Sequence, residues 1–74
     1  MNDALPQAAT LEVLTRRDEG GVATLTLNRP RQFNALSATL LQALHKALDA
    51  VAEDESVRVV VIAGSGPAFC AGHD

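Results

Sequence analysis

The sequence predicts an α/β fold whose elements follow the order strand, strand, helix, strand. Two alternating segments flank a polar, glycine-rich connection, leucines then recur at helical spacing, and a short β-branched segment follows. Of the 74 residues, 47% are hydrophobic, which is typical of a globular chain and not of a disordered one. A chain of this length buries only about 60% of its unfolded surface, so its core is marginal.

The first half of the chain is expected to form a β-hairpin. A strand is predicted over residues 10–17, where Leu11 and Val13 alternate with polar neighbours. Residues 18–21 form a four-residue Asp-Glu-Gly-Gly connection, and a second alternating segment over residues 22–28 predicts the partner strand. Pro30 ends this strand, because proline lacks the amide hydrogen that a β-ladder needs.

A helix is predicted over residues 37–53, with Ser37 as its N-cap. Its apolar face has members three and four residues apart, namely Leu40, Leu41, Leu44, Leu48 and Val51. The next segment, residues 57–63, is apolar almost throughout, the pattern of a strand that is covered on both faces.

A strand, a helix and a second strand form a βαβ unit, in which the two strands run parallel. Their carboxyl ends then lie at the same edge of the sheet, so residues 28–36 and 64–74 should emerge side by side. Open α/β sheets bind their ligands at this edge. One helix covers only one face of the last strand, so the second layer of the fold is expected to be incomplete.

Composition excludes several classes of protein. The net charge is −3 and the six basic residues are scattered, so we expect no nucleic-acid partner. No apolar run is long enough for a membrane span or a signal peptide, and residues 1–9 are interpreted as a disordered lead-in. The single cysteine fits a reducing compartment, and we expect a cytoplasmic protein.

The individual motifs are weak when each is taken alone. The Gly-Ser-Gly turn at residues 64–66 lacks the third glycine of a dinucleotide fingerprint. Cys70, His73 and Asp74 are residue types of a nucleophilic triad, but neighbours on one turn seldom point at each other. Cys70 is therefore predicted to be a small buried hydrophobe.

Two further features have structural interpretations. His45 and Asp49 lie four residues apart on the predicted helix, so we expect an exposed polar pair and no metal site. The loop residues 32–35, Gln-Phe-Asn-Ala, are interpreted as an ordinary loop in which Phe33 forms an aromatic plug.

Taken together, these segments resemble a known family. The stretch LNRPRQFNALS, the amphipathic helix and the stretch VRVVVIAGSGPAFCAGHD resemble the opening third of the enoyl-CoA hydratase/isomerase (crotonase) family, over residues 11–74. The resemblance implies that residues 10–74 form the N-terminal part of a crotonase-like spiral fold. It also implies acyl-CoA thioester substrates and a homo-oligomer, a trimer or hexamer, in the full-length form.

The same resemblance implies roles for individual residues. The backbone amide of His73 would be the first donor of an oxyanion hole, while the second donor and two glutamates come from later segments of the family's proteins. No cofactor is required, because coenzyme A is part of the substrate. Coenzyme A contacts are implied for seven residues: Arg31, Phe33, Ala35, Ala71, Gly72, His73 and Asp74.

The reaction itself stays open at this point. The expected activity is hydration of a trans-2-enoyl-CoA or isomerisation of a double bond, and the 74-residue chain alone is expected to be inactive. The alternative is a non-catalytic acyl-CoA-binding or interaction module that has lost the second half of the site. Many hydratases have alanine where this chain has His73, so we favour a role for the backbone amide over one for the imidazole.

Overall fold

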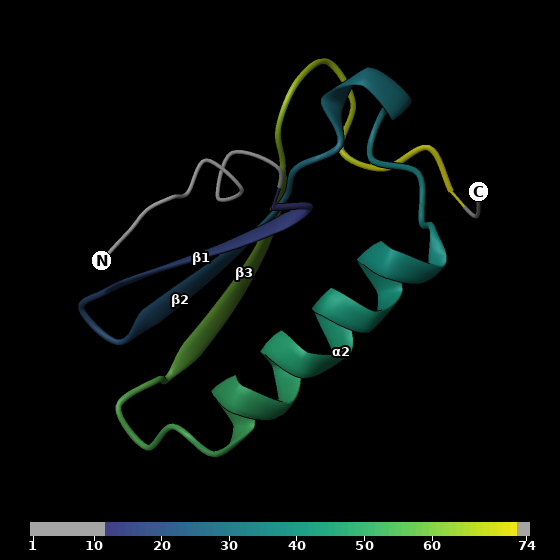
Figure 1. Ribbon diagram of the computed structural model, residues 1–74. Coiled ribbons are helices and arrows are strands. Elements are labelled where there is room, and N and C mark those ends of the chain that lie inside the picture. Colours follow the sequence, from purple (N-terminus) through teal and green to yellow (C-terminus); the bar gives the residue numbers. More distant parts are fainter. Residues whose placement is uncertain (1–11, 73–74) are drawn as a thin grey trace, which may run out of the picture.

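The computed structural model describes residues 12–72, which form one three-stranded sheet and one long helix (Figure 1). The strand order is β1-β2-β3, with β1 and β2 antiparallel and β2 and β3 parallel. The predicted ββαβ order and the parallel pairing are therefore confirmed. The elements are β1 (Leu14–Glu19), β2 (Val22–Leu27), the short 3₁₀ turn η1 (Pro30–Gln32), α2 (Ala38–Ala52) and β3 (Val59–Gly64).

The first strand begins later than predicted. β1 runs to Glu19, and only Gly20 and Gly21 form the turn, both with positive φ (59° and 83°). Two glycines suit a tight hairpin turn, which lets the charged residues before them pair with β2. The predicted alternation of Leu11 and Val13 did not mark the strand: Leu11 lies outside the described residues and Val13 precedes β1.

The predicted helix and its N-cap are confirmed to within one residue at each end. The Ser37 hydroxyl accepts a hydrogen bond from the Leu40 amide at 3.1 Å. Within the predicted apolar face, Leu40 and Val51 are buried, whereas Leu41 and Leu48 remain 39% exposed. The core lies between α2 and the hairpin, where Val51 meets the inward residues of β2.

β3 starts two residues later than predicted and ends at Gly64. The register places Val60 and Ile62 on the face that α2 shares with the hairpin, and Val59 and Val61 on the opposite face. All four side chains are 39–52% exposed, because α2 packs against β1 and β2. Within residues 12–72, the second layer is thus incomplete, and β3 is open on both faces.

A charge cluster joins the hairpin to the end of α2. Arg16 donates two hydrogen bonds to Asp18, each at 2.7 Å, and one to Asp54 at 2.9 Å. The hydrogen bond from Arg16 holds the pKa of Asp18 below its ordinary value. The pKa of Asp54 is also lowered. The larger cause is its hydrogen bonds with Ser56, and the smaller one is its hydrogen bond with Arg16.

Among the described residues, no helix has the length and apolarity needed to cross a membrane.

Candidate functional site

Two loops lie side by side at the carboxyl ends of β2 and β3 (Figure 1). We call residues 28–36 the first loop and residues 65–72 the second loop. The Ala71 amide donates to the Phe33 carbonyl at 2.8 Å, and the Leu36 amide donates to the Gly72 carbonyl at 2.8 Å. The predicted juxtaposition at this edge is therefore confirmed for the described part of the second segment.

Asn34 is the residue that fills the space between the loops. Its side chain is fully buried, its Oδ1 accepts from the Arg29 amide at 2.7 Å, and its Nδ2 donates to the carbonyls of Ser65 and Ala68, each at 2.8 Å. The sequence interpretation named the wrong residue, since Phe33 is 52% exposed and is no plug. The signal that could have identified Asn34 is its amide side chain, which offers two donors and an acceptor to the main chain of a neighbouring loop.

The first loop turns through two consecutive left-handed residues. Phe33 has φ 52° and Asn34 has φ 56°. For an aromatic residue this conformation costs roughly 1 kcal/mol or more, so the surrounding contacts must hold it in place. The Phe33 amide donates to the Pro30 carbonyl at 3.1 Å, and the Asn34 amide donates to the Arg29 carbonyl at 2.9 Å. As a result, the carbonyl of Phe33 meets the second loop while much of its ring stays in solvent.

Glycines allow the two loops to approach this closely. A Cβ atom on Gly64 would lie 2.5 Å from the carbonyl oxygen of Phe69 and 3.0 Å from Nδ2 of Asn34. A Cβ atom on Gly66 would lie 2.7 Å from Cβ of Pro30, and its φ is +81°. Contacts below 3.0 Å require the backbone to shift, so both positions need glycine for close approach.

The structure places five of the seven predicted binding residues around the joined loops. Arg31 is exposed in η1 and lines a hollow of about 340 Å³, and Ala35 is half-buried, with its carbonyl accepting from the Arg29 guanidinium. Beyond Phe33, described above, Ala71 is exposed and Gly72 is half-buried with φ +104°. His73 and Asp74 lie outside the described residues.

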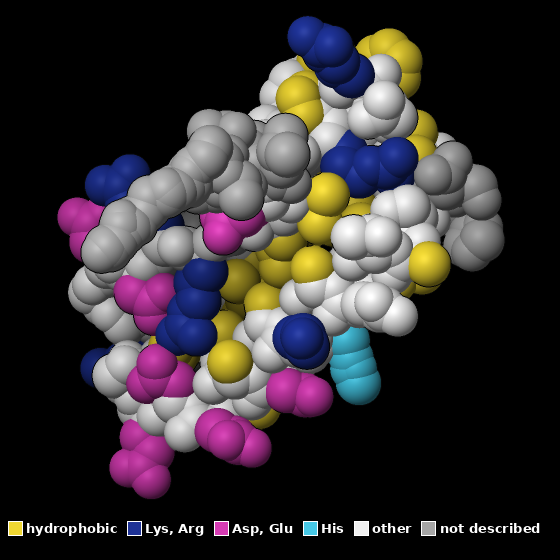
Figure 2. Space-filling view, viewed as in Figure 1, with side chains coloured by type: hydrophobic (Ala, Val, Ile, Leu, Met, Phe, Trp, Pro, Cys, Tyr) yellow, Lys and Arg dark blue, Asp and Glu magenta, His cyan; other side chains and the backbone are white. Residues whose placement is uncertain are grey.

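The edge that carries the loops is basic, although the chain as a whole is acidic. The two loops contain Arg29 and Arg31 and no acidic residue. In Figure 2, basic side chains appear at the upper end, where the loops lie, without acidic neighbours, whereas at the left basic side chains lie among Asp and Glu side chains. The charge of this edge therefore favours an anionic ligand such as a phosphate.

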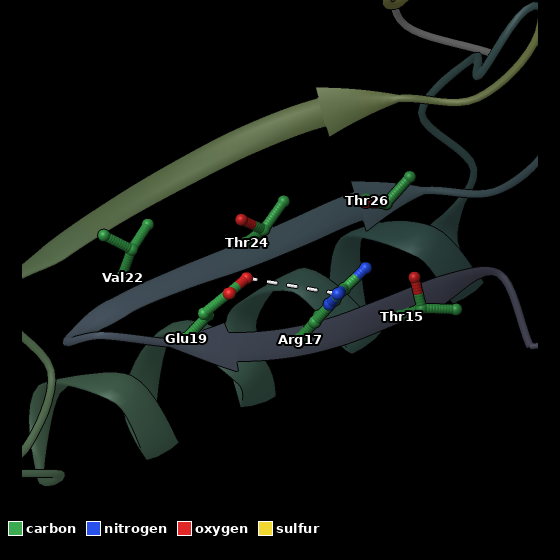
Figure 3. A pocket seen from close by; sticks show the side chains of 6 residues that line it. All are labelled: Thr15, Arg17, Glu19, Val22, Thr24 and Thr26. Carbon is green, nitrogen blue, oxygen red and sulfur yellow. Dashed lines mark ion pairs between the residues drawn. The ribbon is translucent and has the colours of Figure 1, made fainter.

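A second hollow lies on the sheet face opposite α2, away from the loops (Figure 3). This hollow is a shallow surface depression with a volume of about 590 Å³ that is open to solvent. None of the predicted site residues lines it. In this hollow, the Arg17 guanidinium and the Glu19 carboxylate are 4.0 Å apart, and both side chains are more than four-fifths exposed. Such an exposed ion pair contributes little to the stability of the fold. The hollow is lined by Thr15, Arg17, Glu19, Val22, Thr24 and Thr26.

The remaining sequence interpretations concern a cysteine and a histidine. Cys70 is half-buried, less than predicted, and its Sγ accepts from the Gly72 amide at 3.4 Å. His45 and Asp49 form the predicted exposed polar pair, with Nε2 and Oδ2 3.8 Å apart. Among residues 12–72, no group of three His, Cys, Asp or Glu side chains could hold a metal ion.

Comparison with known proteins gives consistent matches. The family described as enoyl-CoA hydratase/isomerase matches residues 17–74. The chain is 44% identical over 71 residues to 3-hydroxyisobutyryl-CoA hydrolase 1 of Arabidopsis thaliana, covering 96% of this chain and 18% of that protein. It is 38% identical over 64 residues to the 1,2-epoxyphenylacetyl-CoA isomerase of Escherichia coli, covering 86% of this chain and 24% of that protein.

Solved structures agree with the sequence matches. The crystal structure of an enoyl-CoA hydratase from Mycobacterium smegmatis is 64% identical, with a TM-score of 0.81, over 85% of this chain and 25% of that chain. The chain thus spans about a quarter or less of the length of these proteins. Its ββαβ arrangement is the N-terminal portion of the crotonase-like fold. Because the family match covers most of the sequence, the chain belongs to the enoyl-CoA hydratase/isomerase family.

Proposed function

We propose that this chain supplies the first part of an acyl-CoA site in an enzyme that hydrates trans-2-enoyl-CoA or isomerises a double bond in an acyl-CoA. The observation that carries the proposal is the pair of loops that are hydrogen-bonded to each other at one basic edge of the sheet. Family membership narrows the ligand to an acyl-CoA, and the matched relatives are named as acting on acyl-CoA thioesters.

Within this proposal, the main chain at the end of the second loop performs the electrostatic step. The amide of His73 donates a hydrogen bond to the thioester oxygen, which becomes enolate-like in the transition state. Removing one such donor typically costs about 10²–10³-fold in rate. The backbone hydrogen bonds of Ala71 and Gly72 support this role, because they hold the two residues before His73 against the first loop.

The coenzyme A part of the substrate would lie along the first loop. The Arg31 guanidinium is exposed and can pair with the phosphates, and the exposed ring of Phe33 offers a face for the nucleotide or the pantetheine. Small residues at Ala35 and Ala71 leave main-chain groups accessible to the ligand. Coenzyme A arrives as part of the substrate, so no separate cofactor is proposed.

Two measurements on the complete gene product test the proposal. Calorimetry with coenzyme A measures binding, and loss of the conjugated thioester absorbance measures hydration of crotonyl-CoA. We expect saturable binding together with turnover. Binding without turnover of any enoyl-CoA would instead indicate the non-catalytic module, and absence of binding would overturn the proposal.

The proposed assembly is a trimer or hexamer, which sedimentation tests. The proposed location is the cytoplasm, which cell fractionation tests.

A further inference from the structure

Asn34 differs from the other polar side chains in the described part of the chain. It is the buried polar residue there, and its carbonyl oxygen and amide nitrogen both have partners. Nδ2 carries two hydrogens and donates to two carbonyls, and Oδ1 accepts from one backbone amide. A fully satisfied buried amide fixes the position of each group that it contacts.

The partners of Asn34 lie at defined points along the two loops. Arg29 is near the start of the first loop, while Ser65 and Ala68 are the start and the middle of the second loop. Beyond Ala68, the second loop is held again where the Ala71 amide meets the Phe33 carbonyl, next to Asn34. The Asn34 side chain therefore holds the first half of the second loop, and the backbone hydrogen bonds at Ala71 and Gly72 hold its end.

From this arrangement we propose that Asn34 is a positioning residue of the acyl-CoA site, which sets where the second loop delivers its main-chain groups. The effect of Asn34 on catalysis rests on the proposed function. Its effect on the position of the second loop does not depend on any ligand. Aspartate would keep the acceptor and lose both donors, and alanine would lose all three hydrogen bonds. In either variant, the carbonyls of Ser65 and Ala68 would be left without this partner, which is unfavourable where they are buried.

The decisive measurement is amide hydrogen exchange on the ligand-free complete gene product, followed by mass spectrometry. In Asn34→Ala and Asn34→Asp, we expect protection within residues 65–72 to fall at least about tenfold at the amides of Ser65 and Ala71, which donate to Leu27 and Phe33. The reason is that the second loop loses the two carbonyl contacts to Asn34 that hold it in place. Residues 38–52 should change much less. The matched control is Ser37→Ala, which removes a hydrogen bond at the start of α2 and should leave residues 65–72 protected.

The aspartate variant adds a readout that a merely structural role would not move. Once protonated, the introduced carboxyl group regains one donor, so the protection of residues 65–72 should partly recover as the pH falls, after correction for intrinsic exchange rates. The alanine variant should show no recovery. A pH-independent loss in both variants would overturn the assignment of the donors, as would unchanged protection or equal loss in residues 38–52.

Kinetics then test the catalytic consequence separately. With crotonyl-CoA, the Asn34→Asp variant should lose at least about tenfold in kcat with a smaller change in KM, because Arg31 still contacts the ligand while the oxyanion donor is displaced. A rise in KM alone would overturn the positioning of the oxyanion donor. If the wild-type protein turns over no enoyl-CoA, the proposed function fails, and the exchange data still decide the role of Asn34.

Discussion

Replacing Gly64 with alanine should push the two loops apart without removing a hydrogen-bonding group. Gly64 is the last residue of β3, and its φ lies outside the left-handed region, so an alanine backbone fits there. The added methyl group is the whole perturbation. It would meet the carbonyl oxygen of Phe69 at 2.5 Å and its Cα at 2.8 Å, both of them backbone atoms that cannot rotate away.

The size of the effect follows from these distances. Ordinary van der Waals contact begins at 3.4 Å, so the Phe69 carbonyl must retreat by about 0.9 Å. Inserting a methyl group into a packed region typically costs about 1–3 kcal/mol. The same shift strains the hydrogen bonds from Asn34 to the second loop, each worth about 0.5–1.5 kcal/mol. We therefore expect Gly64→Ala to lower the free energy of unfolding by about 2–4 kcal/mol.

Urea denaturation of the complete gene product measures this loss, and hydrogen exchange locates it. Gly20→Ala is the matched control, because a Cβ atom there meets nothing within 4 Å and the cost comes only from its positive φ. That control should cost about 1–2 kcal/mol and leave residues 65–72 protected. If Gly64→Ala costs less than its control, or if exchange in residues 65–72 is unchanged, the close approach of the loops does not constrain this site.

Four further outcomes are expected from the structure and the proposed function. Arg31→Ala should raise the KM for crotonyl-CoA about tenfold with little change in kcat, and an unchanged KM would remove Arg31 from the coenzyme A path. His73→Ala should keep most of the turnover, whereas His73→Pro, which deletes the amide, should lose at least about 100-fold; equal losses would make the imidazole catalytic. The two aspartates that pair with Arg16 have pKa values below the ordinary 3.8, so their stabilisation is present above that pH and should be lost as the pH falls through the lowered values. Urea midpoints should fall more steeply with acid in the wild type than in Arg16→Ala. Finally, the isolated 74-residue chain, which exposes apolar β3 on both faces, should self-associate in sedimentation experiments, and Val61→Lys should reduce this; a monodisperse wild-type monomer that melts cooperatively would contradict it.

The helix and the last strand were predictable because each has a strong local signal. The leucine spacing identified α2, the N-cap at Ser37 set its start, and the β-branched run identified β3. The start of β1 was not predictable in the same way. Pairing with β2 decides the register, and a two-glycine turn brings charged residues such as Asp18 into the strand, although their side chains carry no apolar alternation.

The candidate site was only partly predictable, because its contacts join residues about thirty positions apart. Topology alone placed the two loops at one edge, since the strands before them are parallel. Burial could not be deduced in the same way. Hydrophobicity favoured Phe33 as the buried residue of the first loop, but the carbonyls of Ser65 and Ala68 need donors, and the amide side chain of Asn34 reaches both.

The backbone conformation of the first loop connects these observations. If Phe33 were buried in place of Asn34, the second loop would lose its donors, and the left-handed turn would lose the hydrogen bond from the Arg29 amide to the Asn34 side chain. With Asn34 inside, the ring of Phe33 is directed outward and its carbonyl toward Ala71. One buried amide therefore produces both features that a thioester ligand of this edge would need: an exposed aromatic ring on the first loop and a fixed main chain on the second.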